Sequence, residues 1–478
     1  MPKPSRAELA ALVLVGALVL VQLMWPPIIG VASNGDFERM MKWGGLEYVA
    51  QDNNEKYFGW INREFRFARS PWRVWCCFGS SEAIFVKLGA IVGNWLLPGD
   101  RFDLRIIGIV HLLGFLTAFW LLLRGWQAAT QLSPLWLLPG FLLLFCDLGY
   151  TAYFHSFYSE PASLIFLLAM VGAGFYLATR PDLGTLTVFC LCAGLFIAAK
   201  PQNFALAPAL LLFCARLWFL RREGMWRGLL AVFAIALVSA AVLLNLIAPH
   251  YRDATRYHSV FYGILKDSPT PEQDLRALGL DERFAVLANT TTFHQGLPLD
   301  INSPEFRADF LDRISHFKVL RFYLTHPHRL LEKLRLTAAR GYTLRLEYAG
   351  NFEHASGQPA HSQAYRWSWW SSFKQEHWPK SLWLLAGYCL LLAGLLLKGY
   401  RRAAPSGRLL CEFGLMLWLM LLAAFVTPII GDGESDLTKH LFLFNALFDL
   451  SLLFFTAYLA ARLWRAIAGT IPMSRALI

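Results

Sequence analysis

The sequence predicts an all-α membrane protein that crosses the bilayer about ten times. Of its 478 residues, 56% are apolar and only 16% are charged, whereas soluble domains carry about 25% charged residues. Apolar runs also recur along the chain at the length needed to cross a bilayer. This composition excludes an array of soluble domains, and it excludes disorder, which requires low hydrophobicity and dense charge.

Runs of about 20 apolar residues locate the spans, because that length crosses the hydrocarbon layer as a helix. The predicted spans are 9–31, 104–123, 134–153, 161–179, 184–199, 204–220, 228–248, 381–398, 409–430 and 438–461. A further run at 83–97 contains Lys87 and Asn94. We expect it to form a helix that lies on the membrane surface.

The placement of basic residues predicts that both termini face the cytoplasm, because Lys and Arg favour cytoplasmic segments. The short outer connections carry only Lys200 and Lys439. The inner segments carry Lys3, Arg6, Arg124, Arg180, Arg221, Arg222, Arg227, Lys398, Arg401, Arg402, Arg408, Arg462, Arg465 and Arg475. The net charge of +11 is therefore attributed to anchoring at anionic headgroups rather than to nucleic-acid binding.

Two long outer segments divide the chain into three parts. An N-terminal membrane module, 1–248, contains the first outer loop, 32–103; a large helical outer loop follows at 249–380, and a C-terminal membrane module at 381–478. Part of the second loop, 303–324, is amphipathic with helical period. The first loop carries basic and aromatic residues at roughly helical spacing, which predicts helices lying on the bilayer: Trp43, Trp60, Trp72, Trp75, Arg63, Arg66, Arg69 and Arg73.

Four polar clusters fall at outer ends of predicted spans. They are 34–39, 153–161, 200–203 and 431–440, and each contains an acid or a lysine. Ionisable groups at membrane depth are candidates for function because burying them in hydrocarbon is costly. We therefore predict one site at the outer water–lipid boundary.

A transferase at that boundary needs an activated donor that crosses the membrane, such as a sugar linked to polyprenyl phosphate. The reaction needs a carboxylate that deprotonates the acceptor hydroxyl. It also needs cations that stabilise the leaving phosphate and a groove for the lipid tail. Asp36 and Glu38 can supply the carboxylate, and Lys200, Lys439 and His440 can supply the cations.

The segments NGDFERMMKWGGL, FHSFYSEP, AAKPQN, HSVFYGILKDSPTPEQDLRALGL and GDGESDLTKHLFLFNALFD together resemble the bacterial integral-membrane hexose transferases of surface-glycan (S-layer glycan) biosynthesis, within the GT-C glycosyltransferase superfamily. The resemblance implies a GT-C-like fold in the bacterial inner (cytoplasmic) membrane with the site on the outer face. It implies inverting transfer of a hexose from a polyprenyl-phosphate donor to a glycan or lipid-linked acceptor. Asp36 would be the base and Lys200 a phosphate ligand; here, however, the acids are split as Asp36-Phe37-Glu38 rather than adjacent.

The candidate site residues are assigned three roles. The catalytic candidates are Asp36, Glu38 and Glu160. The donor-phosphate candidates are Lys200, Lys439, His440, Arg340 and Arg345. The substrate-binding candidates are His155, Tyr158, Gln202, Asn203, Asp432, Glu434 and Asp436. The sequence contains no metal motif, and a divalent cation stays possible.

Structural interpretations stay open for several of these residues. Asp36 could cap the following helix, Lys200 and Lys439 could reach toward the interface from their spans, and the acidic turn at 432–436 could be a solvated loop. Within the last span, Asn445 and Asp449 are four residues apart and are expected to form hydrogen bonds between helices. For His111 and Asp147, helix packing is the default expectation.

Two other functions compete with the transferase. A glycan polymerase or ligase of the O-antigen type would rely on residues of the second outer loop: Arg321, His326 and His328. A transporter or flippase of lipid-linked sugars would show inverted repeats and broken helices at the midplane, and the sequence shows neither.

Overall fold

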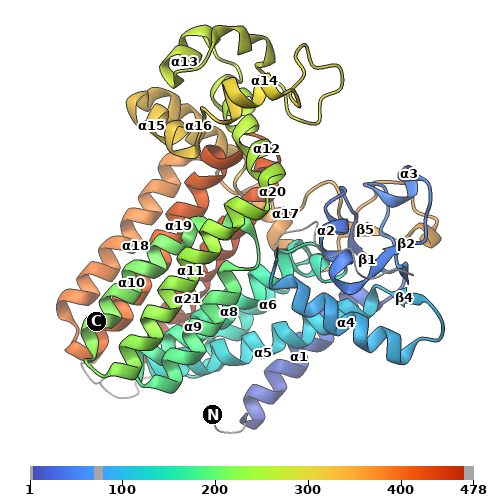
Figure 1. Cartoon of the computed structure of the whole chain (residues 1–478). Helices are drawn as coiled ribbons and strands as arrows, with labels where there is room; N and C mark the ends of the chain where they lie inside the picture. Colours follow the sequence, from blue (N-terminus) through green and yellow to red (C-terminus); the bar gives the residue numbers. More distant parts are fainter. Residues whose placement is uncertain (1–3, 69–78, 468–478) are drawn as a thin grey trace.

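The computed structural model describes residues 4–68 and 79–467, so Lys3, Arg475 and the predicted surface residues Arg69, Trp72, Arg73 and Trp75 lie outside the described ranges. The predicted fold class is confirmed, because the chain forms a polytopic helical bundle with little sheet. Figure 1 places both chain ends at one end of the bundle and the segment containing α12–α16 at the opposite end.

Within the described ranges, eight helices are long and apolar enough to cross a membrane. They are α1 (Arg6–Met24), α5 (Arg105–Thr130), α8 (Glu160–Thr179), η5 (Pro201–Leu206) continued by α10 (Ala207–Leu220), α11 (Gly224–Ile247), α18 (Leu382–Arg402), α19 (Pro405–Asp432) and α21 (Phe442–Ile467). The predicted span 9–31 is too long at its end: α1 stops at Met24, because Pro26 and Pro27 follow and disfavour helix.

The other two predicted spans are also helical but are interrupted or short. Run 134–153 forms a bent pair, η3 (Pro134–Leu137) with α6 (Leu138–Leu144) and then α7 (Leu148–Thr151) with η4 (Ala152–Phe154), with a 74° bend between the halves. Run 184–199 forms α9 (Leu183–Ile197), which has only 15 residues. These two predicted spans therefore do not form single straight helices that are long enough to cross a membrane.

Asp147 explains the bend in the first of these runs. Its carboxylate accepts hydrogen bonds from the backbone N–H groups of Gly149 at 2.7 Å, Trp370 at 2.9 Å and Ser371 at 3.0 Å. The side chain therefore starts a new helix and anchors a distant outer segment. The expectation that Asp147 only packs between helices is wrong. Its carboxylate oxygens instead accept hydrogen bonds from backbone N–H groups that lack a partner within their own helix.

The predicted surface helix 83–97 forms α4 (Glu82–Leu96), and its position on a membrane stays a prediction. The carboxylate of Glu82, at the start of α4, is buried, bonds His111 Nε2 at 2.7 Å and accepts from the backbone N–H of Ala162 at 3.1 Å. This contact joins α4 to α5 and to the first turn of α8.

The first outer loop is less helical than predicted. It contains α2 (Phe37–Met41), η1 (Lys42–Gly44) and α3 (Asn53–Lys56), and a three-stranded antiparallel sheet in the order β2 (Leu46–Tyr48), β3 (Glu64–Phe67), β4 (Arg101–Asp103). The prediction of a surface helix through Arg63 and Arg66 is wrong. Residues 64–67 alternate polar and apolar, which is the period of a strand.

The second outer segment contributes short helices and a strand that pairs with the first loop. Its elements are α12 (Pro249–Ser259), the π-helix η6 (Val260–Ile264), α13 (Pro271–Leu278), η7 (Glu282–Leu287), α14 (Pro304–Phe306), the π-helix η8 (Arg307–Leu311), α15 (His316–Thr325), α16 (Pro327–Arg340), β5 (Ala349–Phe352), η9 (His354–Ser356) and α17 (Trp369–Glu376). β5 pairs antiparallel with β1 (Ile29–Val31).

The predicted amphipathic helix 303–324 is interrupted in the structure. α14 and η8 end before Asp312, and α15 begins again at His316. The side chain of Ser315 accepts from the backbone N–H of Lys318 at 3.3 Å and caps the new helix. Buried apolar residues lie on both sides of the break, such as Phe310 and Val319, whereas the apolar residues Phe317 and Leu324 are exposed.

α8 is the central helix of the bundle, since 83% of its spanning window is buried, against 11% for α18. The expected hydrogen bonds of the last span are confirmed. Asn445 donates to the carbonyl of Gly341 at 2.7 Å, and the carboxylate of Asp449 binds Lys374 at 3.0 Å and accepts from the hydroxyl of Tyr150 at 2.6 Å. Burial of α8 fixes the position of Glu160, the first residue of this helix.

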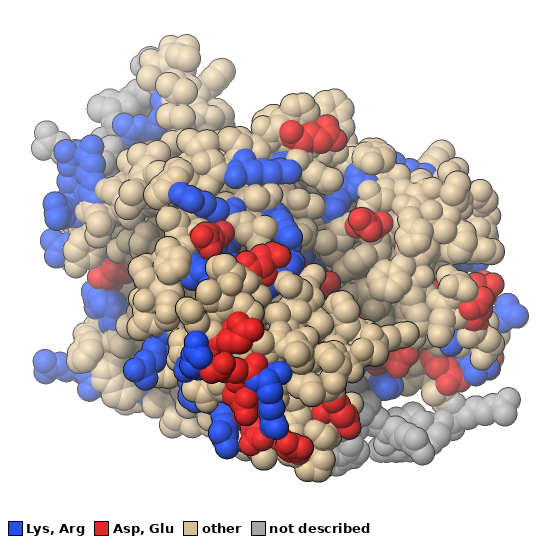
Figure 2. Space-filling view, turned by 90° about the horizontal axis from the view of Figure 1, so that it is seen from above, with Lys and Arg blue, Asp and Glu red and all other residues tan. Residues whose placement is uncertain are grey.

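Seen from the end that carries α12–α16, the surface shows interspersed basic and acidic side chains (Figure 2). Ion pairs there join Arg283 to Glu305 at 2.9 Å and to Asp309 at 2.5 Å, and Arg307 to Asp253 at 2.8 Å. The pair of Arg283 with Glu305 is exposed, and exposed pairs of this kind contribute little stability.

Candidate active site

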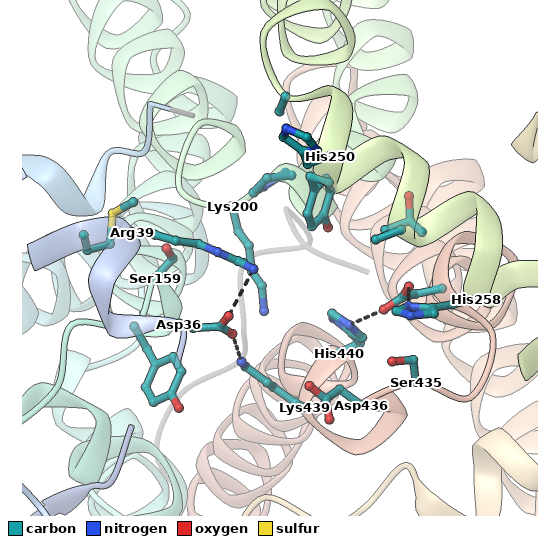
Figure 3. Close-up of a pocket in the computed structure, with 18 of the residues that line it drawn as sticks. Asp36, Arg39, Ser159, Lys200, His250, His258, Ser435, Asp436, Lys439 and His440 are labelled. Carbon is teal, nitrogen blue, oxygen red and sulfur yellow. Dashed lines mark hydrogen bonds and ion pairs between the residues drawn. The ribbon is translucent and has the colours of Figure 1, made fainter. Parts of the chain in front are cut away.

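A cavity of about 380 Å³ lies where α2, the starts of α8 and η5, α12, the end of α19 and α20 (Leu437–His440) meet. All four predicted polar clusters contribute to its lining. The predicted site residues that line it are Asp36, Tyr158, Glu160, Lys200, Asp432, Asp436, Lys439 and His440. Figure 3 shows Asp36, Lys200 and Lys439 on one side and His440 and His258 across from them.

Asp36 is paired with two cations. Its carboxylate forms an ion pair with Lys439 and lies 3.2 Å from Arg39. It occupies the N-cap position of α2 but makes no capping hydrogen bond, so the interpretation of Asp36 as a side-chain cap is wrong. Burial acts to raise the pKa of the Asp36 carboxyl, but Lys439, Arg39 and Lys200 outweigh it and lower this pKa to about 2. Asp36 is therefore ionised at neutral pH.

A tight turn aims Asp36 into the cavity. Gly35 adopts a φ of +101°, which a residue with a Cβ rarely tolerates. The side chain of Asn34 accepts from the backbone N–H of Asp36 at 3.2 Å, and Tyr158 bonds both the side chain of Asn34 at 2.8 Å and its backbone N–H at 2.9 Å. Tyr158 also presents its ring to the ammonium of Lys439 at 4.6 Å, a stabilising cation–π contact.

Glu160 and Lys200 form a second ion pair, with 2.8 Å between Nζ and Oε1. The Glu160 side chain is 2% exposed and that of Lys200 17%. Lys200 precedes Pro201 at the start of η5, and its side chain reaches into the cavity (Figure 3). A pair this buried is costly to break, because each group would be left as an uncompensated charge.

Asp432, the last residue of α19, bridges two histidines. Its carboxylate lies 2.8 Å from Nδ1 of His258 and 3.0 Å from Nε2 of His440. On the other side of His440, Gln202 donates to the His440 carbonyl oxygen at 2.5 Å and turns its amide oxygen to Nδ1 at 3.0 Å. Both ring nitrogens of His440 therefore face acceptor oxygens. His258 Nε2 instead accepts from the backbone N–H of Thr292 at 3.1 Å.

The acidic turn 432–436 sends its side chains to different partners. Asp432 and Asp436 line the cavity, whereas Glu434 binds Lys266 at 2.7 Å, Lys333 at 2.8 Å and Arg340 at 3.4 Å. Burial acts to raise the pKa of Glu434, but Lys266 and Lys333 outweigh it and lower this pKa. The solvated-loop interpretation is wrong for Glu434, which is 5% exposed.

Several predicted residues lie away from the cavity. Glu38 faces a separate hollow, where it accepts from Tyr57 at 3.1 Å and lies 3.9 Å from Lys42. His155 is fully buried and bonds the carbonyl of Ile29 at 2.7 Å. The structure does not bring Glu38 or His155 into contact with the other candidates.

The remaining predicted residues support neighbouring elements. Arg345 is buried and donates to the carbonyl of Ala364 at 2.6 Å. Asn203 is buried and donates to the carbonyl of Phe196 at 2.8 Å. Gln202 lines a neighbouring cavity, and Arg340 pairs with Glu434. The structure therefore places Arg340 and Arg345 away from Lys200 and Lys439.

Sequence reasoning missed Arg39, His250, Tyr251, His258 and Phe293, which also line the cavity. Two of these residues could have been identified from the sequence. Arg39 follows Asp36 by three residues, so it lies one helical turn away. His258 is the first residue of HSVFYGILKDSPTPEQDLRALGL, one of the segments that carry the family resemblance. Phe293 belongs to a loop with no such pattern.

A second cavity of about 310 Å³ adjoins the first. The two share Pro201, Tyr251, Thr255, Asp432 and His440, among other residues. Away from these shared residues, its lining combines the apolar side chains of Ala205, Leu244, Pro428 and Ile430 with the polar side chains of Gln202, Arg252, His316 and Thr427. The charged cavity thus adjoins a mainly apolar space between η5, α11, α12 and α19.

Within residues 4–68 and 79–467, no group of three or more His, Cys, Asp or Glu side chains is arranged to hold a metal ion. Three acids of the cavity, Asp36, Glu160 and Asp432, are instead engaged by Arg, Lys or His side chains. These carboxylates therefore do not form a preformed cation site.

Fold and site together define a polytopic helical membrane protein with a charged cavity at one end of its bundle. The chain belongs to the family of the YfdI N-terminal transmembrane domain, whose model matches residues 3–470. A search of curated proteins gave no match.

Two solved structures, both of the oligosaccharyltransferase of Archaeoglobus fulgidus, are similar to the chain. One, tethered to an acceptor peptide with an NVT sequon, has 11% identity and a TM-score of 0.39, covering 98% of this chain and 52% of that one. The other, AglB with an inhibitory peptide and a dolichol-phosphate, has 14% identity and a TM-score of 0.40, covering 98% and 53%. The chain spans about half the length of these proteins.

Proposed function

We propose that the protein is an inverting glycosyltransferase of the GT-C type. It transfers a hexose from a polyprenyl-phosphate donor to a glycan or lipid-linked acceptor. The observation that carries this proposal is the ionised Asp36 in one cavity with Arg39, Lys200 and Lys439. An apolar cavity between membrane spans adjoins these charges.

Asp36 serves as the base. The acceptor oxygen attacks the anomeric carbon, the bond from that carbon to the phosphate oxygen breaks, and the hydroxyl proton passes to the Asp36 carboxylate. Polyprenyl phosphate leaves, and the anomeric configuration inverts. Phosphate is a good leaving group, so this step needs one carboxylate rather than the two of glycoside hydrolysis. Asp36 is ionised at neutral pH, so it is in the proton-accepting form.

The cations serve the leaving phosphate. Lys200 and Lys439 are held in the cavity by Glu160 and Asp36, so they are positioned before substrate arrives. His440, when protonated, adds a further positive charge on the opposite side. Preorganised cations lower the energy of charge that develops on the departing oxygen, because they need no rearrangement during the reaction.

The apolar cavity accepts the first isoprene units of the donor. Its lining by Ala205, Leu244, Pro428 and Ile430 suits a hydrocarbon chain. A donor seated there would place its phosphate beside Lys200 and His440, because Pro201 and His440 line both cavities.

We assign the protein to the bacterial inner membrane, with both termini cytoplasmic and the cavity on the outer face. The basic inner segments support this orientation. So does the placement of both chain ends opposite the α12–α16 segment (Figure 1).

The test uses purified protein in lipid nanodiscs with a panel of polyprenyl-phosphate hexoses and glycan acceptors. Wild-type protein should release polyprenyl phosphate in an acceptor-dependent manner, and Asp36→Asn should abolish the release. Glu38→Gln is the matched control, because Glu38 lies two residues away in a different hollow. Full activity of Asp36→Asn would remove the base assignment.

No observation favours the polymerase or ligase alternative. Arg321, His326 and His328 lie on α15 and at the start of α16 and do not line the cavity, and His326 stacks on Phe322 instead. Loss of activity on their replacement by alanine, with Asp36→Ala tolerated, would revive that reading.

A further inference from the structure

Phe293 is an aromatic side chain presented to water at the rim of the cavity. It lines the cavity, yet it is 78% exposed. A single exposed apolar residue needs no explanation by itself. Phe293 differs from such residues because the structure fixes the backbone on both sides of it.

Hydrogen bonds hold this segment in place. The backbone N–H of Thr292 donates to His258 Nε2 at 3.1 Å, and the Thr292 hydroxyl lies 3.0 Å from the same nitrogen. The backbone N–H of Phe293 donates to the Thr291 hydroxyl at 3.3 Å. The Phe293 ring lies 5.6 Å from the His258 ring, and His258 is bonded to Asp432. The ring is therefore tied to the bundle through His258.

Groups that suit sugar hydroxyls share this cavity. His250, Ser435 and Asp436 are among its lining residues (Figure 3), and His250 and Asp436 are exposed. A pyranose ring has one face of C–H groups and a rim of hydroxyls. The C–H face carries slight positive charge and packs on the negative face of an aromatic ring. One flat ring among polar side chains fits a sugar better than it fits a lipid chain.

The position of Phe293 distinguishes acceptor from donor. Phe293 is absent from the lining of the apolar cavity that suits the prenyl chain. It belongs to the outer segment that rises beyond the ends of the spans (Figure 1). A donor reaches the cations from the membrane, whereas an acceptor glycan that extends into water must enter past this rim.

We propose that Phe293 is the platform on which a sugar ring of the acceptor stacks, and that it sets acceptor specificity. His258 is a positioning residue that acts through Thr292. The proposal rests on the proposed function, since it names how that site recognises its second substrate.

The experiment compares wild type with Phe293→Ala, Phe293→Leu and Phe293→Trp in nanodiscs. Phe317→Ala is the matched control, because Phe317 is 74% exposed on α15 and lines no described cavity. The acceptor KM in Phe293→Ala should rise about tenfold, the value expected for loss of one stacked aromatic contact. The donor KM should change much less than the acceptor KM, because Phe293 is absent from the lining of the apolar cavity. Tryptophan should restore the acceptor KM, and leucine should not.

A second readout does not depend on turnover. Saturation-transfer NMR with a panel of methyl hexopyranosides and short oligosaccharides should show contact with aromatic protons in wild type and Phe317→Ala, and none in Phe293→Ala. Sugar contact unchanged in Phe293→Ala, a panel with no contact in wild type, or full rescue by leucine would each overturn the platform. Sugar contact without any transfer would instead contradict the proposed function.

Discussion

The ammonium of Lys439 is ion-paired with the carboxylate of Asp36, although 403 positions separate the two residues in the sequence. The pair joins the first outer loop to the helix that precedes the last span. It brings the proposed base and a proposed phosphate ligand into direct contact before any substrate is bound. Several measurable consequences depend on this contact and on its neighbours.

Replacing Lys439 should impair catalysis without unfolding the protein. Lys439→Met removes a cation from the leaving phosphate, and we expect kcat/KM for donor release to fall about 100-fold. Lys439→Arg should retain a larger share of the activity, because it keeps the charge. Lys42→Met is the control, because Lys42 pairs with Glu38 at an exposed position outside the cavity. Equal losses in the two methionine variants would contradict the assignment.

The Glu160–Lys200 pair should show strong energetic coupling. We expect Glu160→Gln and Lys200→Met each to lower the free energy of unfolding by about 3 kcal/mol, and the double variant to lose much less than the sum. The exposed pair Arg221–Glu223, at 3.1 Å, provides the comparison and should couple by less than about 0.5 kcal/mol. Chemical unfolding of the single and double variants measures both cycles, and additive losses at Glu160 and Lys200 would show that the pair is not formed.

His440 should matter through its charge. His440→Gln keeps hydrogen-bonding capacity but cannot take up a proton between Asp432 and Gln202, and kcat/KM should fall at least about tenfold. His440→Lys should lose less. His377→Gln, at an exposed position just after α17, is expected to behave as wild type. If glutamine and lysine at position 440 gave the same rate, the positive charge would not contribute.

Gly433 should not tolerate a side chain. Its φ is +60°, and a Cβ there would lie 2.6 Å from the carbonyl oxygen of His258 and 2.8 Å from the Cα of Gly263. Gly433→Ala should therefore cost about 3 kcal/mol of stability and displace Asp432. Gly431→Ala has open space in α19 and should be neutral or slightly stabilising, because alanine favours helix. Thermal unfolding measures the stability of both variants. Equal midpoint temperatures would show that a Cβ at position 433 meets no close neighbour.

The low pKa of Asp36 predicts a specific acid sensitivity. The pKa of Asp36 is lowered from an ordinary 3.8 to about 2, so its ion pairs stabilise the folded state above about pH 4. That contribution is lost as the pH falls from about 4 toward 2. In Asp36→Asn the contribution is absent at every pH, so the stability difference from wild type should shrink over this interval. Thermal midpoints of both proteins in detergent between pH 2 and 6 test this, and a constant difference would contradict it.

The sequence was informative where one physical signal dominates. Apolar length located the helices, and the polar clusters located the cavity, because ionisable groups at span ends are exceptional. Sequence could not show which cluster members turn inward. Asp432 and Glu434 are two residues apart, yet their side chains reach different partners, and the conformation of Gly433 between them decides this.

The other incorrect predictions concern residues whose roles are set by tertiary contacts. Asp147 looked like a packing residue in a continuous span, but backbone donors of Trp370 and Ser371 make it a helix start. Arg63 and Arg66 have helical spacing, but the strand at Glu64–Phe67 pairs with two others. His155 stood in a polar cluster, but it serves the carbonyl of Ile29. In each case the partner lies far away in sequence.

The pairing of β1 with β5 has a consequence for how the protein can be cut. Gly30 lies in β1, shortly after the end of the first membrane helix at Met24, and pairs with Asn351 in β5 of the second outer segment. If a protease cuts the chain between α16 and β5, the β1–β5 pairing and the buried spans still hold the two fragments together. The two fragments should therefore co-purify after the cut, and this architecture also favours their reassembly when they are expressed separately.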